Sequence, residues 1–188
     1  MSETEKERFV TYYFNGMHEM PYRGEDRLIV PSPKVATYDA MPEMAARELT
    51  QRLLDRITID VYNFILINFA NPDMVAHTGN IAAAIRACEV TDECVGNIVD
   101  ATLARGGTCV ITGDHGNVEE MLTADGQMDT EHSQFPVPLI IVNNSLQGRA
   151  VTLPFGKLAD VAPTILSLMG IPVPTEMTGN NLLADFSA

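Results

Sequence analysis

The stretch Asn68-Phe-Ala-Asn-Pro-Asp-Met-Val-Ala-His-Thr-Gly79 decides how the rest of the chain is interpreted. The apolar run before it, Val61–Ile67, has the length and the β-branched content of a buried strand. Pro72 ends that strand, and Asp73 and His77 follow four residues apart, at the end of a strand where open α/β sheets place their ligand sites. If this turn is helical, the two side chains share a face and could hold one cation. The alternative is an Asp–His hydrogen bond that only ties down a loop.

Composition predicts one globular domain over residues 1–188, because 46% of the residues are hydrophobic and 20% are charged. No apolar run approaches the roughly 20 residues of a membrane span, and the start has no signal-peptide core. The net charge of −13 argues against nucleic acid or an anionic membrane as a partner. It also disfavours a phosphorylated substrate unless metal ions or a basic lobe offset the field. The odd number of cysteines, Cys88, Cys94 and Cys109, predicts reduced thiols in a cytoplasmic protein.

Patterns typical of strands and helices alternate along the chain. Strands that alternate with helices predict an α/β fold, a three-layer sandwich with a largely parallel sheet covered on both faces. We expect strands over 9–14, 61–67, 108–112 and 137–142, helices over 42–57, 80–105 and 158–169, and an irregular stretch with prolines over 17–42.

Three of the four histidines lie in loops beside predicted strand ends. Asp114 and His115 directly follow one strand, and His132 lies shortly before another. With Asp73 and His77 they offer oxygen and imidazole donors without a thiolate, which suits manganese, zinc or magnesium. We therefore predict a metal centre. The alternatives are that Asp114 caps a following helix and that His132 is a solvated loop residue.

A pair of divalent cations would suit phosphoryl transfer. Two cations about 3.5–4 Å apart stabilise both the attacking and the leaving oxygen, and they would bring positive charge to an acidic protein. Covalent catalysis also needs a nucleophile. No cysteine has the pattern of an activated thiol, and no serine sits on an exposed strand-to-helix turn. The serines are Ser2, Ser32, Ser133, Ser145, Ser167 and Ser187.

Several blocks, which together span essentially the whole chain, resemble the cofactor-independent phosphoglycerate mutases. The blocks are Glu3–Lys6, Val10–Gly16, Gly24–Arg27, Pro31–Asp39, Asp73–Gly79, Asp114–Asn117 and His132. Two further blocks are shared more widely with the alkaline phosphatase superfamily, namely Asp160–Leu166 and Met177–Gly179. The resemblance implies an incomplete alkaline-phosphatase-like fold, the C-terminal part of the phosphatase domain. It also implies a glycolytic isomerase that interconverts 3-phosphoglycerate and 2-phosphoglycerate through a phosphoserine in the complete enzyme.

In that family two manganese ions bind one active site, and zinc or magnesium could replace them. The resemblance implies that Asp73, His77 and His132 hold one ion. It implies that Asp114 and His115 form part of the site of the other ion.

Lys6 matches the family's lysine that contacts the transferring phosphoryl group of phosphoglycerate. Its positive charge could neutralise charge there, which makes Lys6 the candidate catalytic residue. Without the resemblance, Lys6 would be interpreted as a solvated lysine at a helix end.

The family's enzyme is much longer than 188 residues. Its phosphatase domain begins with a strand that supplies a metal-binding aspartate and then the phosphorylated serine, and an inserted transferase domain supplies most of the arginines that grip phosphoglycerate. Neither has a counterpart here, so we expect the chain alone to lack mutase activity and to keep the first metal site. Open sheet edges favour a homodimer or association with the missing N-terminal half. Ala76 stands where the family usually has glycine, and Gly113 where it usually has alanine.

Two other interpretations stay open. The chain could be another superfamily member, such as a phosphopentomutase, a phosphatase or a sulfatase, although the blocks around Lys6 and Pro31–Asp39 argue against this. It could also be a metal-binding remnant without catalytic activity that serves as a subunit. An upstream reading frame that encodes the missing half would favour a split mutase.

Overall fold

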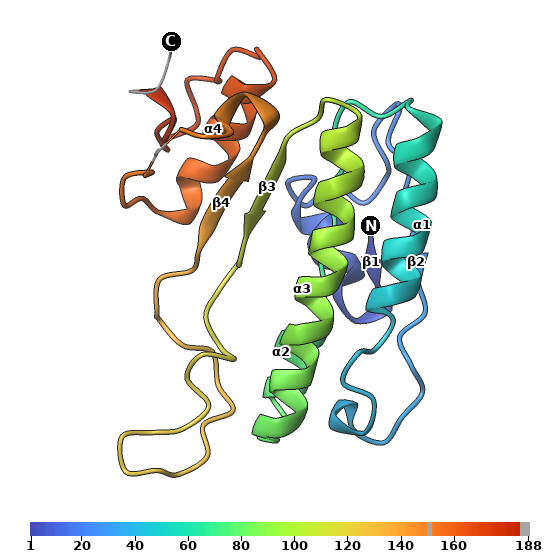
Figure 1. Ribbon diagram of the computed structural model, residues 1–188, viewed down its shortest axis with the longest axis vertical. Helices are drawn as coiled ribbons and strands as arrows, with labels where there is room; N and C mark the ends of the chain where they lie inside the picture. Colours follow the sequence, from blue (N-terminus) through green and yellow to red (C-terminus); the bar gives the residue numbers. More distant parts are fainter. Residues whose placement is uncertain (150–151, 185–188) are drawn as a thin grey trace. The chain divides into compact units, whose positions relative to one another are not determined.

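The computed structural model describes residues 1–149 and 152–184, and these form two compact units (Figure 1). The first unit comprises residues 1–107 and 115–137. The second comprises residues 108–114 and the described residues from 138 onward. Among the described residues, no helix combines the length and the apolar character that crossing a bilayer requires.

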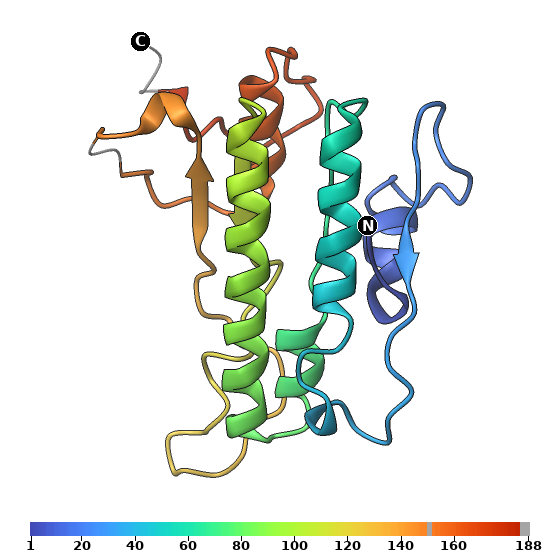
Figure 2. The same cartoon turned by 45° about the vertical axis from the view of Figure 1, so that its right-hand side comes forward.

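Three helices form the centre of the first unit. They are α1 (Ala46–Ile59), α2 (Asn71–Ala76) and α3 (Ile81–Ala104). In Figures 1 and 2, α1 and α3 run side by side, and α2 lies along the first half of α3. The cap of α3 is Asn80, whose side chain accepts the N–H of Ala83, and the helix is closed by Gly106 with a φ of 72°. These signals are local, and the helix predicted over 80–105 is confirmed.

A buried asparagine fixes α2 against α3. The amide of Asn71 donates to the carbonyl of Ala87 at 2.9 Å and accepts the hydroxyl of Thr91 at 3.2 Å. Asn71 is fully buried, so these bonds offset the cost of removing its amide from water. Small side chains let the two helices approach, namely Val75, Ala76, Ala83, Ala84 and Ala87. The start of α2 is therefore held rigidly.

The other long helix, α1, begins later than the sequence predicts. We expected a helix over 42–57, but residues 42–45 form turns, and Met44 has a φ of 44°. The carboxylate of Glu3 accepts the N–H of Ala45, the residue before the helix. The proline-rich stretch over 17–42 is irregular as predicted, apart from a short strand and a 3₁₀ turn.

The chain begins in a small parallel pairing between β1 (Ser2–Glu3) and β2 (Ile29–Val30). Met1, directly before β1, pairs with a second segment of the chain. Its amino group donates to the carbonyl of Leu66 at 2.7 Å, and its carbonyl accepts the N–H of Asn68 at 3.0 Å. The N-terminus therefore links β2 to the stretch that leads into α2.

The predicted buried strand over 61–67 is wrong, because this stretch belongs to no strand in the described part of the chain. Its end runs beside Met1, which pairs with the carbonyl of Leu66 and the N–H of Asn68. A strand requires a partner for its N–H and C=O groups, and the apolar sequence alone does not supply one. Val61 and Phe64 stay 63% and 42% exposed. The stretch has strand-like composition without a strand partner.

The predicted strand over 9–14 is also wrong, because residues Phe9–Tyr13 form a π-helix. Thr11 donates its hydroxyl to the carbonyl of Glu7 at 2.7 Å, a local bond within a helical turn. The strand preference of aromatic residues reflects packing against neighbouring strands. Without such a neighbour, local hydrogen bonds decide the conformation, and the Phe9 and Tyr13 side chains stay about half exposed.

In the second unit, β3 (Cys109–Thr112) and β4 (Leu139–Val142) pair antiparallel. The two strands were predicted, but within a largely parallel sheet. The connection over 113–138, all of which the structure describes, contains no helix. Parallel neighbours require a crossover connection, usually a helix, so β4 returns in the antiparallel direction.

The C-terminal helix predicted over 158–169 is present as a 3₁₀ turn (Leu158–Asp160) followed by α4 (Val161–Leu168). The Asp160 carboxylate accepts the N–H groups of Lys157 and Asn180, each at 2.8 Å. Gly179 has no room for a side chain, because a Cβ atom there would lie 1.9 Å from the carbonyl oxygen of Ala159. The two blocks shared with the wider superfamily thus have a structural role in this unit.

Candidate metal centre

Helix α2 places Asp73 and His77 on one face. Pro72 occupies the first turn, where its missing N–H costs nothing. Asp73 lies in the same turn, and the N–H of His77 closes the helix on the Asp73 carbonyl at 3.1 Å. As a result the Nε2 atom of His77 lies 3.1 Å from Oδ1 of Asp73. The helical turn that would allow a shared cation is therefore present.

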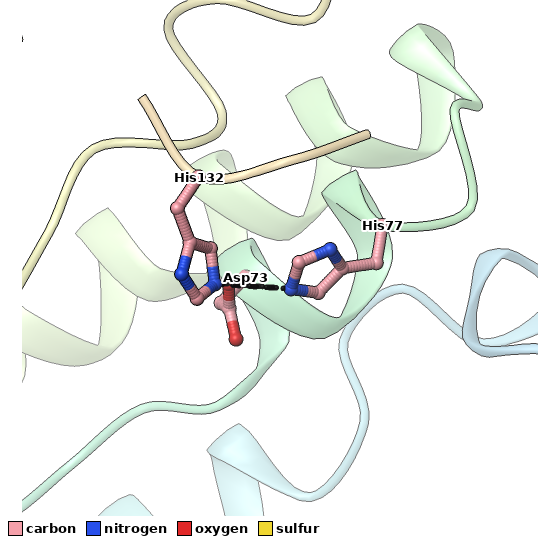
Figure 3. Close-up of side chains that lie close together, drawn as sticks. All are labelled: Asp73, His77 and His132. Carbon is pink, nitrogen blue, oxygen red and sulfur yellow. Dashed lines mark hydrogen bonds and ion pairs between the residues drawn. The ribbon is translucent and has the colours of Figure 1, made fainter. Parts of the chain in front are cut away.

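His132 reaches the same point from a distant loop. Its Nε2 atom lies 3.2 Å from Oδ1 of Asp73 and 3.2 Å from Nε2 of His77. Figure 3 shows the three side chains converging, with the two imidazoles on either side of the carboxylate. The Nδ1 atom of His77 lies 2.6 Å from the carbonyl of Thr130, which can only accept. In a neutral imidazole, that contact places the proton on Nδ1 and leaves Nε2 with a lone pair for a ligand.

Two buried donors hold the Asp73 carboxylate. The Lys6 ammonium lies 2.5 Å from Oδ2, and the Asn117 amide donates to Oδ1 at 2.7 Å. Partial burial raises the pKa of Asp73, but the hydrogen bonds from Lys6 and Asn117 outweigh it and lower the pKa to about 2. Asp73 is therefore a carboxylate at neutral pH. Lys6 is only 7% exposed, so the ion pair with Asp73 offsets the cost of burying its ammonium.

His115 lies beside the triad, stacked on His132 with ring centroids 3.8 Å apart. Its Nε2 atom is 4.0 Å from Oδ1 of Asp73. The structure thus brings together five of the six predicted site residues in the first unit. Asp114, the sixth, follows β3 in the second unit.

The three converging donors fit a single divalent cation. Asp73, His77 and His132 offer one ligand atom each, all within 4.8 Å of one another. Ligands that share an ion at about 2.0–2.2 Å lie about 3 Å apart, which matches the separations of 3.1–3.2 Å. An aspartate with two imidazoles is a donor set that manganese, cobalt and zinc accept. Three protein ligands would leave at least one coordination position of the ion for a further ligand.

Two further residues of the site were not predicted from the sequence. Asn117 is 4% exposed and belongs to the Asp114–Asn117 block, but no role was assigned to it. Glu119 accepts the hydroxyl of Ser133 and the backbone N–H of Asn117. Burial would raise the pKa of Glu119, yet these two hydrogen bonds hold it below its ordinary value. An acidic residue two positions after this block was the only signal in the sequence.

Comparisons with known proteins agree with this geometry. The family model described as the metalloenzyme superfamily matches residues 1–173. The chain is 54% identical to a 2,3-bisphosphoglycerate-independent phosphoglycerate mutase from Desulforudis audaxviator and 52% identical to one from Clostridioides difficile. These matches cover 98% and 97% of this chain, but only 35% and 36% of the relatives. The chain therefore spans about a third of the length of the curated relatives it matches.

A solved structure of phosphoglycerate mutase from Leishmania mexicana, determined at low cobalt concentration, matches with a TM-score of 0.84 and 31% sequence identity. The match covers 95% of this chain and 35% of the other. It confirms the predicted α/β fold of the alkaline-phosphatase type, present in incomplete form. The chain therefore belongs to the metalloenzyme superfamily, and within it is similar to a segment of the 2,3-bisphosphoglycerate-independent phosphoglycerate mutases.

Proposed function

We propose that this chain is the metal-binding C-terminal part of a phosphoglycerate mutase that interconverts 3-phosphoglycerate and 2-phosphoglycerate. The observation that carries the proposal is the convergence of the Asp73, His77 and His132 donor atoms within 4.8 Å. Similarity to mutases over nearly the whole chain supports it. We also propose a cytoplasmic location, which the free thiols of Cys88 and Cys94 support.

We propose two divalent cations, with manganese as the native metal. Asp73, His77 and His132 would hold the first, and Asp114 with His115 would contribute to the second. When bound, such ions supply positive charge to phosphoryl oxygens. They would also reconcile a net charge of −13 with an anionic substrate.

Lys6 is the proposed catalytic residue of this segment. Its ammonium is held 2.5 Å from Oδ2 of Asp73 and lies over the Phe9 ring, with Nζ 4.9 Å from the ring centroid. These contacts fix one positive charge beside the metal ligands. From there Lys6 would donate to a phosphoryl oxygen of phosphoglycerate, so that its charge neutralises the charge that develops during transfer.

We further propose that the chain associates with the part of the mutase that it lacks, rather than with a second copy. The stretch over 61–67 supports this, because in the described chain it belongs to no strand and its backbone is paired only at Leu66, with Met1. Residues 68–70 alone separate this stretch from the start of α2, which carries Asp73. A strand added along it would therefore end close to the metal ligands.

The metal proposal is tested by calorimetric titration of Mn²⁺ into the purified chain after removal of metals with a chelator. We expect saturable binding with a Kd below about 1 mM. Mg²⁺ should bind more weakly, because it prefers oxygen ligands to the two imidazoles. The proposal is wrong if millimolar Mn²⁺ produces no binding heat and does not raise the melting temperature.

A further inference from the structure

Two histidines of the site each directly precede one partner of an isolated β-bridge. Gly116 and Ser133 form an isolated antiparallel bridge, and the N–H of Ser133 donates to the Gly116 carbonyl at 2.9 Å. His115 directly precedes Gly116, and His132 directly precedes Ser133. The bridge therefore sets the separation of the two imidazoles, whose rings stack at 3.8 Å with an angle of 23° between their planes.

Glu119 ties the two sides of this bridge together. One carboxylate oxygen accepts the hydroxyl of Ser133, and the other accepts the backbone N–H of Asn117 at 2.8 Å. Ser133 also accepts the N–H of Phe135 at 3.3 Å, so its hydroxyl contacts both the Glu119 carboxylate and the backbone two residues further along. Asn117 in turn donates its side-chain amide to Asp73. A single carboxylate thus connects the loop of His132 to the residue that orients the Asp73 carboxylate.

The packing around Gly116 shows how closely these groups approach. A Cβ atom at Gly116 would lie 2.1 Å from Oγ of Ser133 and 2.2 Å from Oε1 of Glu119. Both are far below any normal contact, so only glycine leaves room for the carboxylate and the hydroxyl to meet over the bridge. Gly116 thus provides the space for the hydrogen bond between Ser133 and Glu119.

We propose that Glu119 is a positioning residue of the metal site: through Ser133 and Asn117 it holds His132 and Asp73 in the arrangement that a divalent cation requires. This rests on the proposed metal-binding function of Asp73, His77 and His132. The Glu119 carboxylate hydrogen-bonds to Asn117 and Ser133, and through them it restrains the neighbours of the ligand atoms. Partners of this kind typically change metal affinity by about 10- to 100-fold.

The test compares Glu119→Ala with Glu120→Ala in the full chain. Both variants remove one negative charge, but only the first removes the contacts to Ser133 and Asn117. We expect Glu119→Ala to weaken Mn²⁺ binding by about 10- to 100-fold and to change the visible absorption of the Co²⁺-loaded chain, which reports ligand geometry. Glu120→Ala should leave both unchanged.

Two further variants separate positioning from general destabilisation. Glu119→Gln keeps a carbonyl oxygen for Asn117 and an amide for Ser133, so it should recover most of the affinity and the Co²⁺ spectrum. Adding Ser133→Ala to Glu119→Ala should cost little more than the single change, because both act through one contact. Circular dichroism of each variant checks that the fold is kept.

A metal-free measurement distinguishes this inference from the proposed function. In the chelator-treated chain, Glu119→Ala should shift the imidazole NMR signals of His115 and His132, because their stacking depends on the bridge. If the parent chain binds no metal, both proposals fall. If the parent binds metal but Glu119→Ala matches Glu120→Ala in Mn²⁺ affinity, Co²⁺ spectrum and imidazole shifts, only the role of Glu119 is overturned.

Discussion

Replacing Asp73 with asparagine is expected to weaken Mn²⁺ binding by at least about 100-fold, or about 2.8 kcal/mol. In the triad, Oδ1 of Asp73 lies 3.1 Å from Nε2 of His77 and 3.2 Å from Nε2 of His132. Its pKa of about 2 makes it fully ionised at neutral pH. Asparagine keeps the shape of the side chain but removes the only negative charge in the donor set. Calorimetric titration of both proteins with Mn²⁺ measures the difference.

Two further variants test whether the loss of Mn²⁺ affinity is specific to the metal ligands. Asp100→Asn removes the same charge from an exposed position on α3 and should leave Mn²⁺ binding unchanged. Asp73→Asn also leaves the ammonium of Lys6 without its carboxylate, so the variant should lose about 1–3 kcal/mol of stability as well. His77→Ala removes a ligand without breaking that ion pair and should still weaken binding clearly. An unchanged Mn²⁺ affinity in both variants would place the metal elsewhere.

The second large effect concerns turnover. The chain alone is expected to show no interconversion of 3-phosphoglycerate and 2-phosphoglycerate, and addition of the remaining part of a related mutase should restore it. By resemblance, the phosphorylated serine and the arginines that grip the substrate lie outside the stretch that this chain matches. Loss of a nucleophile costs several orders of magnitude in rate, so the gain on mixing should exceed about a thousandfold. Phosphorus NMR distinguishes the two phosphoglycerates directly.

The control for this reconstitution uses the chain itself. Mixing the remaining part with Asp73→Asn should give a complex without turnover, because the strand contact is kept while the metal ligand is lost. A proline at Ile65, in the extended stretch over 61–67, should prevent the complex from forming, because proline cannot donate to a strand ladder. Turnover by the chain alone would contradict the account. So would a stable, metal-loaded complex that remains inactive.

The site was predictable from sequence where its geometry is local. Asp73 and His77 lie on one short helix, so their spacing alone predicts that they face the same way. The helix over 81–104 carries its own cap at Asn80 and its own stop at Gly106, and it was predicted almost to the residue. In both cases a few neighbouring residues decide the result.

What escaped prediction depends on contacts between distant residues. The stretches over 9–14 and 61–67 have the composition of strands, but a strand exists only when another segment pairs with it. The direction of β4 likewise depends on a connection without a helix. Glu119 could not be singled out, because its role appears only when Ser133 folds back against it.

The most direct test is anomalous X-ray scattering from crystals of the chain soaked in Mn²⁺. We predict a manganese peak at about 2.0–2.3 Å from an oxygen of Asp73 and from the Nε2 atoms of His77 and His132. Ordered manganese bound elsewhere, with none between these three side chains, would contradict the assignment of the site.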